Sequence, residues 1–215
     1  MAPEQITANG DHPDQGQGTS LAPGDVLLDR YTIQECIGQG SLGSIYKATD
    51  ETDGAEVALR QLPADLTEDE DLRAALEKQL QAATALSHKN IVQLRQIFQE
   101  GGQLYVAMEF IQGQTLRGLI AKKKEAGSPF SLKGTYNVVA HLCNALEVAH
   151  HQDVPLTHGL PGPGAVMVND SGRVKLTDFG LLGAIMQRTT NGAAMTDGDC
   201  LAPELRDWNG AVGPA

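Results

Sequence analysis

The sequence is poor in several residue classes, and each shortage narrows what the protein can be. Its 3 cysteines are widely separated and unpaired in spacing, so neither a disulfide framework nor a zinc site is indicated. No apolar run approaches the roughly 20 residues that span a bilayer, and no signal-peptide pattern opens the chain. With 16 basic against 27 acidic residues, the net charge is −11, which argues against nucleic acid or a membrane as partner. These absences favour a cytoplasmic protein.

The chain does contain enough apolar residues for a folded body, since 41% of its 215 residues are hydrophobic. Residues 1–24 are rich in Gly, Pro, Gln and Asp, and we expect a disordered leader there. Three alternating segments then predict an antiparallel meander over residues 30–38, 43–50 and 56–62.

A helix is expected from about Thr67, because the sequence Thr-Glu-Asp-Glu forms a capping box in which Glu70 reaches back. Two further strands, 90–98 and 103–111, complete a β-β-β-α-β-β order. A short helix and a long amphipathic helix over about 132–151 follow, and a hairpin ends in Asp178-Phe179-Gly180.

Gly38, Gly40 and Gly43 form a G-x-G-x-x-G pattern that is weak evidence alone. Its context is more specific, because a strand and not a helix follows the glycines. That order disfavours a dinucleotide-binding turn and favours a loop that lies over phosphates, which glycine lets the backbone approach closely.

Other segments match protein kinase motifs in the same order: "VALR" (57–60), "SHKNIVQL" (87–94), "YVAMEF" (105–110), "GRVKLTDFG" (172–180) and "LAPE" (201–204). Residues 25 to 205 therefore resemble the bacterial-type (Hanks-type) Ser/Thr protein kinase family. The resemblance implies an α+β, protein-kinase-like bilobal fold. Residues 25–110 would be a complete five-stranded N-lobe with helix C. Residues 111–215 would be the hinge and an incomplete, mostly helical C-lobe, truncated just after the activation segment.

The resemblance also implies a nucleotide site. Met108 resembles the gatekeeper, Glu109 to Ile111 the hinge that meets adenine, and Asp178 the ligand of one magnesium ion. The remaining implied nucleotide contacts are the three loop glycines, the apolar walls and the cation of the third strand: Gly38, Gly40, Gly43, Ile45, Ala58, Met167 and Arg60.

The catalytic positions depart from the family pattern. Arg60 replaces the strand lysine, and Gln79 stands where the helix glutamate would pair with it. Where the family has Arg, the catalytic Asp, Lys and Asn, this chain has Gly159, Leu160, Gly162 and Ala165. None of these side chains accepts a proton or binds a metal, and losing a general base alone costs about 10² to 10⁴ in rate. No catalytic residue is assigned.

The sequence therefore predicts an inactive kinase-like domain, a pseudokinase, that serves as a docking or allosteric signalling module. ATP and magnesium would bind weakly or not at all. A divergent Ser/Thr kinase with residual ATP-dependent phosphotransfer is the alternative, and a non-functional kinase fragment is the second alternative. The later helices of the family are missing, so either the chain is a fragment, or the apolar stripe of the helix at 132–151 is covered by another subunit or by the rearranged segments "AIMQ" (184–187) and "WNGAVG" (208–213). A protein partner is expected.

Overall fold

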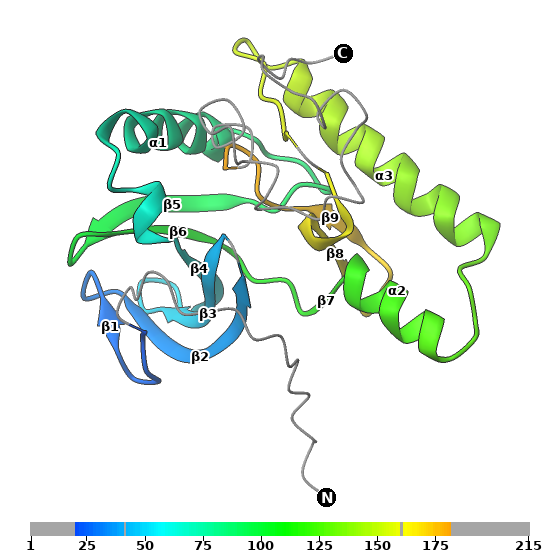
Figure 1. The fold of residues 1–215 in the computed structure, drawn as a ribbon, viewed down its shortest axis with the longest axis horizontal. Coiled ribbons are helices and arrows are strands. Elements are labelled where there is room, and N and C mark those ends of the chain that lie inside the picture. Colours follow the sequence, from blue (N-terminus) through cyan, green and yellow to red (C-terminus); the bar gives the residue numbers. More distant parts are fainter. Residues whose placement is uncertain (1–19, 41, 160, 182–215) are drawn as a thin grey trace, which may run out of the picture.

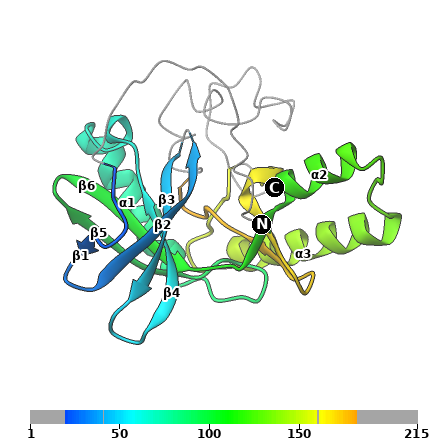
Figure 2. The same cartoon turned by 90° about the horizontal axis from the view of Figure 1, so that it is seen from below.

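The computed structural model describes residues 20–40, 42–159 and 161–181. These residues form two antiparallel sheets, three α-helices and two short 3-10 turns. Figures 1 and 2 show the larger sheet with α1 at one end of the molecule, and α2 and α3 at the other. No helix in these ranges combines the length and the apolar character needed to cross a membrane.

The larger sheet has six strands in the order β1-β2-β3-β4-β6-β5. Its strands are β1 (Val26–Leu27), β2 (Tyr31–Gly40), β3 (Gly43–Asp50), β4 (Ala55–Gln61), β5 (Leu94–Glu100) and β6 (Gln103–Glu109). The predicted meander and the β5–β6 hairpin are confirmed. Gly101 and Gly102 close that hairpin with φ of 57° and 80°, a region that glycine adopts without strain. The sequence prediction missed β1, because two residues show no alternation.

The start of the sheet also corrects the predicted leader. Residues 21–24 were assigned to the disordered segment, but they lie against β2: the Gly24 amide donates to the Ile33 carbonyl oxygen at 2.9 Å. Leu21 packs on the cluster of buried aromatic residues behind the sheet. The Leu21 side chain and the hydrogen bonds of the Leu21, Ala22 and Gly24 amides together fix this stretch.

Helix α1 (Glu70–Thr84) begins three residues later than predicted. Its N-cap is Asp69, whose carboxylate accepts from the Leu72 amide at 2.9 Å. Thr67 instead ends a 3-10 turn (Ala64–Leu66), and its hydroxyl donates to the Ala64 carbonyl oxygen. The capping box was wrong because this turn already engages Thr67.

Both faces of the larger sheet are apolar. Helix α1 covers one face through four buried residues, Leu72, Leu76, Leu80 and Ala83, beside β5 and β6 (Figure 1). On the other face Phe98 stacks between Tyr31 and Tyr105, with ring centroids 5.5 and 5.2 Å apart. The sheet is thus a rigid platform for any site at its edge.

The smaller sheet has the order β7-β8-β9, formed by β7 (Gly113–Thr115), β8 (Val166–Asn169) and β9 (Val174–Leu176). The predicted β8–β9 hairpin is confirmed. A parallel bridge between Ile91 and Leu176 ties β9 to the segment before β5, with the Val92 amide donating to the Leu176 carbonyl oxygen. This bridge places the residues after β9 beside the larger sheet.

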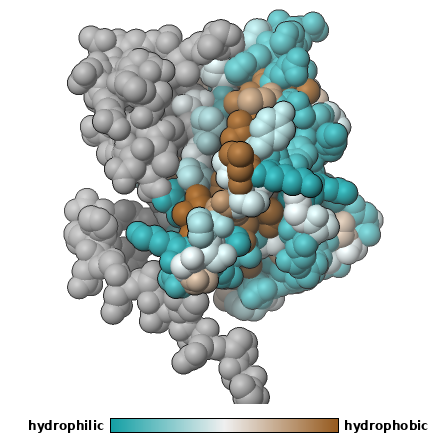
Figure 3. All heavy atoms as spheres, turned by 90° about the vertical axis from the view of Figure 1, so that its right-hand side faces the viewer, coloured by the Kyte–Doolittle hydropathy of each residue, from teal (hydrophilic) through white to brown (hydrophobic). Residues whose placement is uncertain are grey.

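Two helices pack on the smaller sheet: α2 (Leu116–Glu125) and α3 (Leu132–His150), the latter close to the prediction. Ala145 and Ala149 are the fully buried residues of α3, while Leu132, Tyr136 and Val139 are 87%, 74% and 51% exposed. Figure 3 looks onto this side of the molecule and shows apolar surface gathered there. The apolar stripe predicted for this helix is exposed in its first half.

Candidate functional site

The glycine-rich loop is the turn between β2 and β3, where Gly40 pairs with Gly43 and Gly38 with Ile45. Gly43 has φ of 93°, and a Cβ there would lie 1.9 Å from the Gln61 carbonyl oxygen, so only glycine fits. Gly40 has no such constraint, because a Cβ would meet no described atom within 4 Å. Its missing side chain leaves the space beside the loop open.

Four of the predicted adenine contacts come together. Ala58 on β4 pairs with Met108 on β6, and Ile45 and Ile111 pack against the same buried cluster. Met167 lies on β8, half-buried, opposite Lys175 on β9. Of the three predicted apolar walls, Ile45 and Ala58 therefore pack in one core on the larger sheet, and Met167 lies on the smaller sheet.

The Glu109 side chain has a role that the sequence did not indicate. Its carboxylate forms an ion pair with Lys175 of β9 and accepts from the Gln93 amide at 2.9 Å. The backbone amide of Glu109 donates to the Gln93 carbonyl oxygen at 2.9 Å. The predicted hinge segment is therefore fastened to both sheets at its first residue. Lys175 and Glu109 are 66 positions apart, and no sequence pattern pairs them.

Arg60 and Asp178 form a buried ion pair. Arg60 Nη2 lies 2.7 Å from Asp178 Oδ1, and the two side chains are 8% and 7% exposed. Arg60 Nη1 also reaches the Leu42 carbonyl oxygen of the glycine-rich loop at 3.4 Å. The strand cation, the loop and the predicted metal ligand are thus joined. The neutral Gln79 indicated that Arg60 has no carboxylate partner on the helix, but it did not indicate Asp178.

The Asp178-Phe179-Gly180 segment is held from both sides. Asp178 has φ of 67°, in the left-handed region, and Gly180 has φ of 77°. A Cβ on Gly180 would lie 2.6 Å from the Gln79 carbonyl oxygen, so this glycine lets the segment touch the backbone of α1. The position predicted for the helix glutamate therefore meets this segment through its backbone.

His158 supports the same segment from beneath. Its Nε2 lies 2.7 Å from the Thr177 carbonyl oxygen, and its ring stands edge-on to Phe179 at 4.9 Å. Burial lowers the pKa of His158, so the imidazole is neutral near pH 7. Because a carbonyl oxygen can only accept, Nε2 carries the proton that it donates. His158 acts here as a structural donor.

Three of the four predicted degenerate positions lie in the described residues, on the segment that hydrogen-bonds to Thr177 through His158 and Ala165. Gly159 has φ of 88°, and Gly162 precedes a 3-10 turn (Pro163–Ala165). Ala165 is buried, and its carbonyl oxygen accepts from the Thr177 amide at 2.9 Å. The side chain of Ala165 is a methyl group and offers no metal ligand. Leu160 and the Ala-Pro-Glu motif at 202–204 lie outside the described residues.

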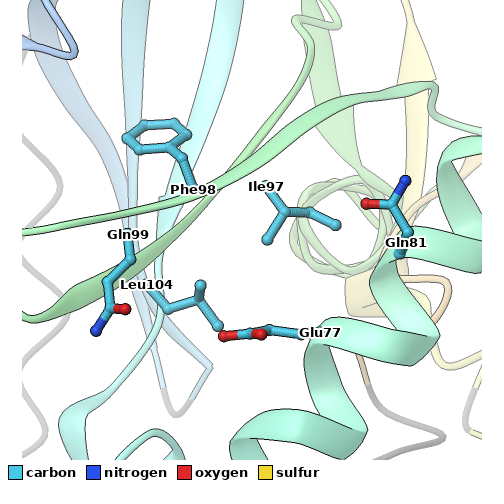
Figure 4. A pocket seen from close by; sticks show the side chains of 6 residues that line it. All are labelled: Glu77, Gln81, Ile97, Phe98, Gln99 and Leu104. Carbon is cyan, nitrogen blue, oxygen red and sulfur yellow. The ribbon is translucent and has the colours of Figure 1, made fainter.

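Glu77, the nearest α1 carboxylate in sequence, does not substitute for Gln79. It lines a separate pocket of about 240 Å³ between α1, β5 and β6. Figure 4 shows its side chain beside Leu104, with Gln81 on the next turn. Its nearest cation is Arg73, at 3.9 Å.

Magnesium does not fit the residues as they lie. The ion prefers near-octahedral oxygen coordination, and the Asp178 carboxylate already binds a guanidinium that cannot lose its charge. In the described part of the chain, no group of three or more His, Cys, Asp or Glu side chains could hold a metal ion. Magnesium on Asp178 stays a prediction, and this geometry argues against it.

Comparison with known proteins agrees with the fold and the motifs. Residues 31–211 match the protein kinase domain family. The probable serine/threonine-protein kinase PknB of Corynebacterium glutamicum is 30% identical over 169 residues, which cover 77% of this chain and 25% of that protein. A probable serine/threonine-protein kinase of Clostridium acetobutylicum is 32% identical over 183 residues, covering 84% and 27%. The chain thus spans about a quarter of the length of these relatives.

A solved structure shows the same fold. The kinase domain of Mycobacterium tuberculosis PknI aligns with a TM-score of 0.69 at 23% identity, covering 83% of this chain and 68% of that one. The family match covers most of the sequence, and the relatives in Corynebacterium and Clostridium are bacterial serine/threonine kinases by name. The chain therefore belongs to the protein kinase family.

Proposed function

We propose that this chain is a pseudokinase: a kinase-like domain that binds an adenine nucleotide, transfers no phosphate, and works as a docking or allosteric module. One observation carries the proposal. Ala165, whose carbonyl oxygen accepts from the amide of Thr177 next to Asp178, has no side chain that could bind a metal, and in this proposal it stands at the position of a kinase's second metal ligand. Gly159 and Gly162, in the same loop, carry no side chain that could act as acid, base or cation.

The magnitude of the loss supports inactivity. A missing general base costs about 10² to 10⁴ in rate, or about 3 to 5 kcal/mol in the barrier. A missing metal ligand and a missing phosphate-binding cation add to that barrier. The relatives are named kinases, so the proposal separates this chain from them by the replacements in its catalytic loop and at Arg60 and Gln79.

Nucleotide binding is supported by what the site retains. Ile45, Ala58 and Met108 share one apolar cluster, as the wall of an adenine site requires, and the space beside Gly40 is open. In this proposal residues 25–110 act as the small lobe and 111–215 as the hinge and partial large lobe.

A protein partner is proposed for the exposed side of α3, because Leu132 and Tyr136 are more than two-thirds exposed. The net charge of −11 favours such a partner over nucleic acid or an anionic membrane. A reducing, cytoplasmic setting suits the exposed thiols of Cys36 and Cys143.

The test is a phosphotransfer assay on the full chain with γ-labelled ATP and magnesium or manganese. PrkC of Bacillus subtilis, a serine/threonine-protein kinase 29% identical over 166 residues, serves as the positive control. We expect no label on the chain itself or on a generic protein substrate, for the wild type and for Asp178→Ala alike. Transfer by the wild type that Asp178→Ala abolishes would establish a divergent kinase instead.

A thermal melt tests the nucleotide-binding part separately. ATP at 100 times its Kd stabilises a protein by about 2.7 kcal/mol, which raises the melting temperature by several degrees. We expect a cooperative melt that shifts upward with ATP. A cooperative melt whose midpoint does not change with ATP would indicate a folded scaffold that binds no ATP. A broad melt would indicate a fragment that does not fold alone.

A further inference from the structure

The Arg60 guanidinium occupies the place that joins the glycine-rich loop to Asp178. Its contact with the Leu42 carbonyl oxygen is long, at 3.4 Å, whereas its contact with Asp178 Oδ1 is short, at 2.7 Å. The short contact is charge-assisted and belongs to the stronger class of hydrogen bonds. A permanent positive charge is thus fixed at the carboxylate that a metal would otherwise use.

Arg60 also has N–H donors that the described acceptors do not engage. A guanidinium has five N–H groups, and the described acceptors engage only its two terminal nitrogens. Its Nε is buried and has no acceptor within the described residues. The long Leu42 contact is the weaker of the two, so an incoming anion can replace it while the Asp178 contact remains. The planar fork of arginine matches the paired oxygens of a phosphate group.

A divalent ion at the same carboxylate would meet two obstacles. It would lie beside the fixed charge of Arg60, and like charges repel strongly where water is excluded. It would also lack ligands, because Ala165 has no ligating side chain and no group of three or more His, Cys, Asp or Glu side chains in the described residues could hold a metal ion. The electrostatic task of the metal therefore falls to a side chain of the protein.

We propose that Arg60 is the built-in cation of this site, so that the chain binds adenine nucleotides as metal-free anions. The inference rests on the proposed nucleotide-binding function and adds to it the form of the ligand. Arg60 faces the phosphates from β4, and Asp178 orients the guanidinium as a positioning residue. Magnesium does not raise the affinity for the nucleotide, because the Arg60 guanidinium already binds the Asp178 carboxylate.

This arrangement reverses the usual effect of changing Asp178. If the carboxylate held a metal, Asp178→Asn would abolish binding of the metal-bound nucleotide. If it instead pairs with Arg60, the amide of Asn still accepts from Nη2 while one negative charge beside the phosphates disappears. Asp178→Asn then tightens ATP binding or leaves it unchanged.

The test is calorimetric titration of the full chain with ATP, once in EDTA and once in magnesium chloride. We expect wild-type dissociation constants that agree within about threefold, a difference well under the 1.4 kcal/mol of a tenfold change. Asp178→Asn should bind ATP in EDTA at least as tightly as the wild type. The double variant Arg60→Gln with Asp178→Asn should bind about tenfold more weakly than Asp178→Asn alone, because it lacks the cation.

Asp178→Asn leaves the buried Arg60 charge without a carboxylate partner, whereas the double variant removes that charge as well, so a thermal melt of each variant must confirm that it folds. Asp53→Asn is the matched control. Asp53 lies on the turn after β3, and its half-exposed carboxylate pairs with Arg95 of β5. Wild-type binding of ATP that is at least tenfold tighter in magnesium would overturn the inference but support the nucleotide site. Loss of ATP binding in Asp178→Asn would have the same meaning. No binding in either medium would overturn both the inference and the nucleotide-binding part of the proposed function.

Discussion

At the scale of single residues, the Arg60–Asp178 pair is the feature on which this site depends. Both side chains are more than nine-tenths buried, so each charge relies on the other in place of water. Such a pair adds little net stability compared with apolar residues of the same shape, but breaking it leaves one charge unpaired. The pair therefore specifies geometry more than it stabilises the fold.

Arg60→Leu should lower the free energy of unfolding by about 3 to 5 kcal/mol, because Asp178 is left as an unpaired buried carboxylate. Adding Asp178→Asn to that variant should recover at least half of the loss. Asn is chosen because it tolerates the left-handed backbone at Asp178, where φ is 67°. Urea denaturation followed by circular dichroism measures both values. A double variant no more stable than Arg60→Leu would show that the loss comes from packing and not from charge.

At the scale of elements, α1 is positioned without the ion pair that the kinase family uses. Its backbone at Gln79 touches Gly180, and its buried leucines cover the larger sheet. Packing and a close backbone approach thus replace the electrostatic link. This makes the integrity of α1, and so its N-cap, important for the Asp178 segment.

Asp69→Ala should lower the free energy of unfolding by about 1 kcal/mol, because the Leu72 amide loses its acceptor at the start of α1. Glu70→Gln is the matched control. The Glu70 side chain is 92% exposed, and its change should cost only a few tenths of a kcal/mol. Urea denaturation of the two variants decides between Asp69 and the Thr67–Glu70 box as the helix start. If Glu70→Gln proved less stable than Asp69→Ala, the predicted Thr67–Glu70 capping box would be supported instead.

The elements also show what a sequence can predict. Alternation located β2 to β6, and turn residues located both hairpins, because each signal lies within one element. The N-cap of α1 was misplaced because the preceding 3-10 turn depends on packing. At the site, the order of the kinase motifs along the chain predicted that the segment with Ala165 lies near the segment with Asp178. The Arg60 partner and the Glu109–Lys175 pair depend on contacts 118 and 66 residues apart, which no local pattern encodes.

At the scale of the whole molecule, the two sheets are joined near the site and the helices diverge from it. The Ile91–Leu176 bridge and the Glu109–Lys175 pair hold the sheets together at one edge. Helix α3 packs on the smaller sheet through Ala145 and Ala149, both fully buried. Its opposite side carries Leu132 and Tyr136 in contact with solvent.

The orientation of α3 predicts two opposite responses to substitution. Leu132→Gln and Tyr136→Gln should each change the free energy of unfolding by less than about 0.5 kcal/mol, because both side chains are exposed. Ala145→Leu should cost about 1 to 3 kcal/mol, since there is no room for the extra methylenes. Urea denaturation at several protein concentrations measures all three. A loss above 1 kcal/mol at Tyr136 that grows with protein concentration would mean that this side of α3 is buried between copies of the chain. The same loss at every concentration would mean that the chain itself buries it. Only an insensitive Tyr136 leaves this surface free for the protein partner proposed above.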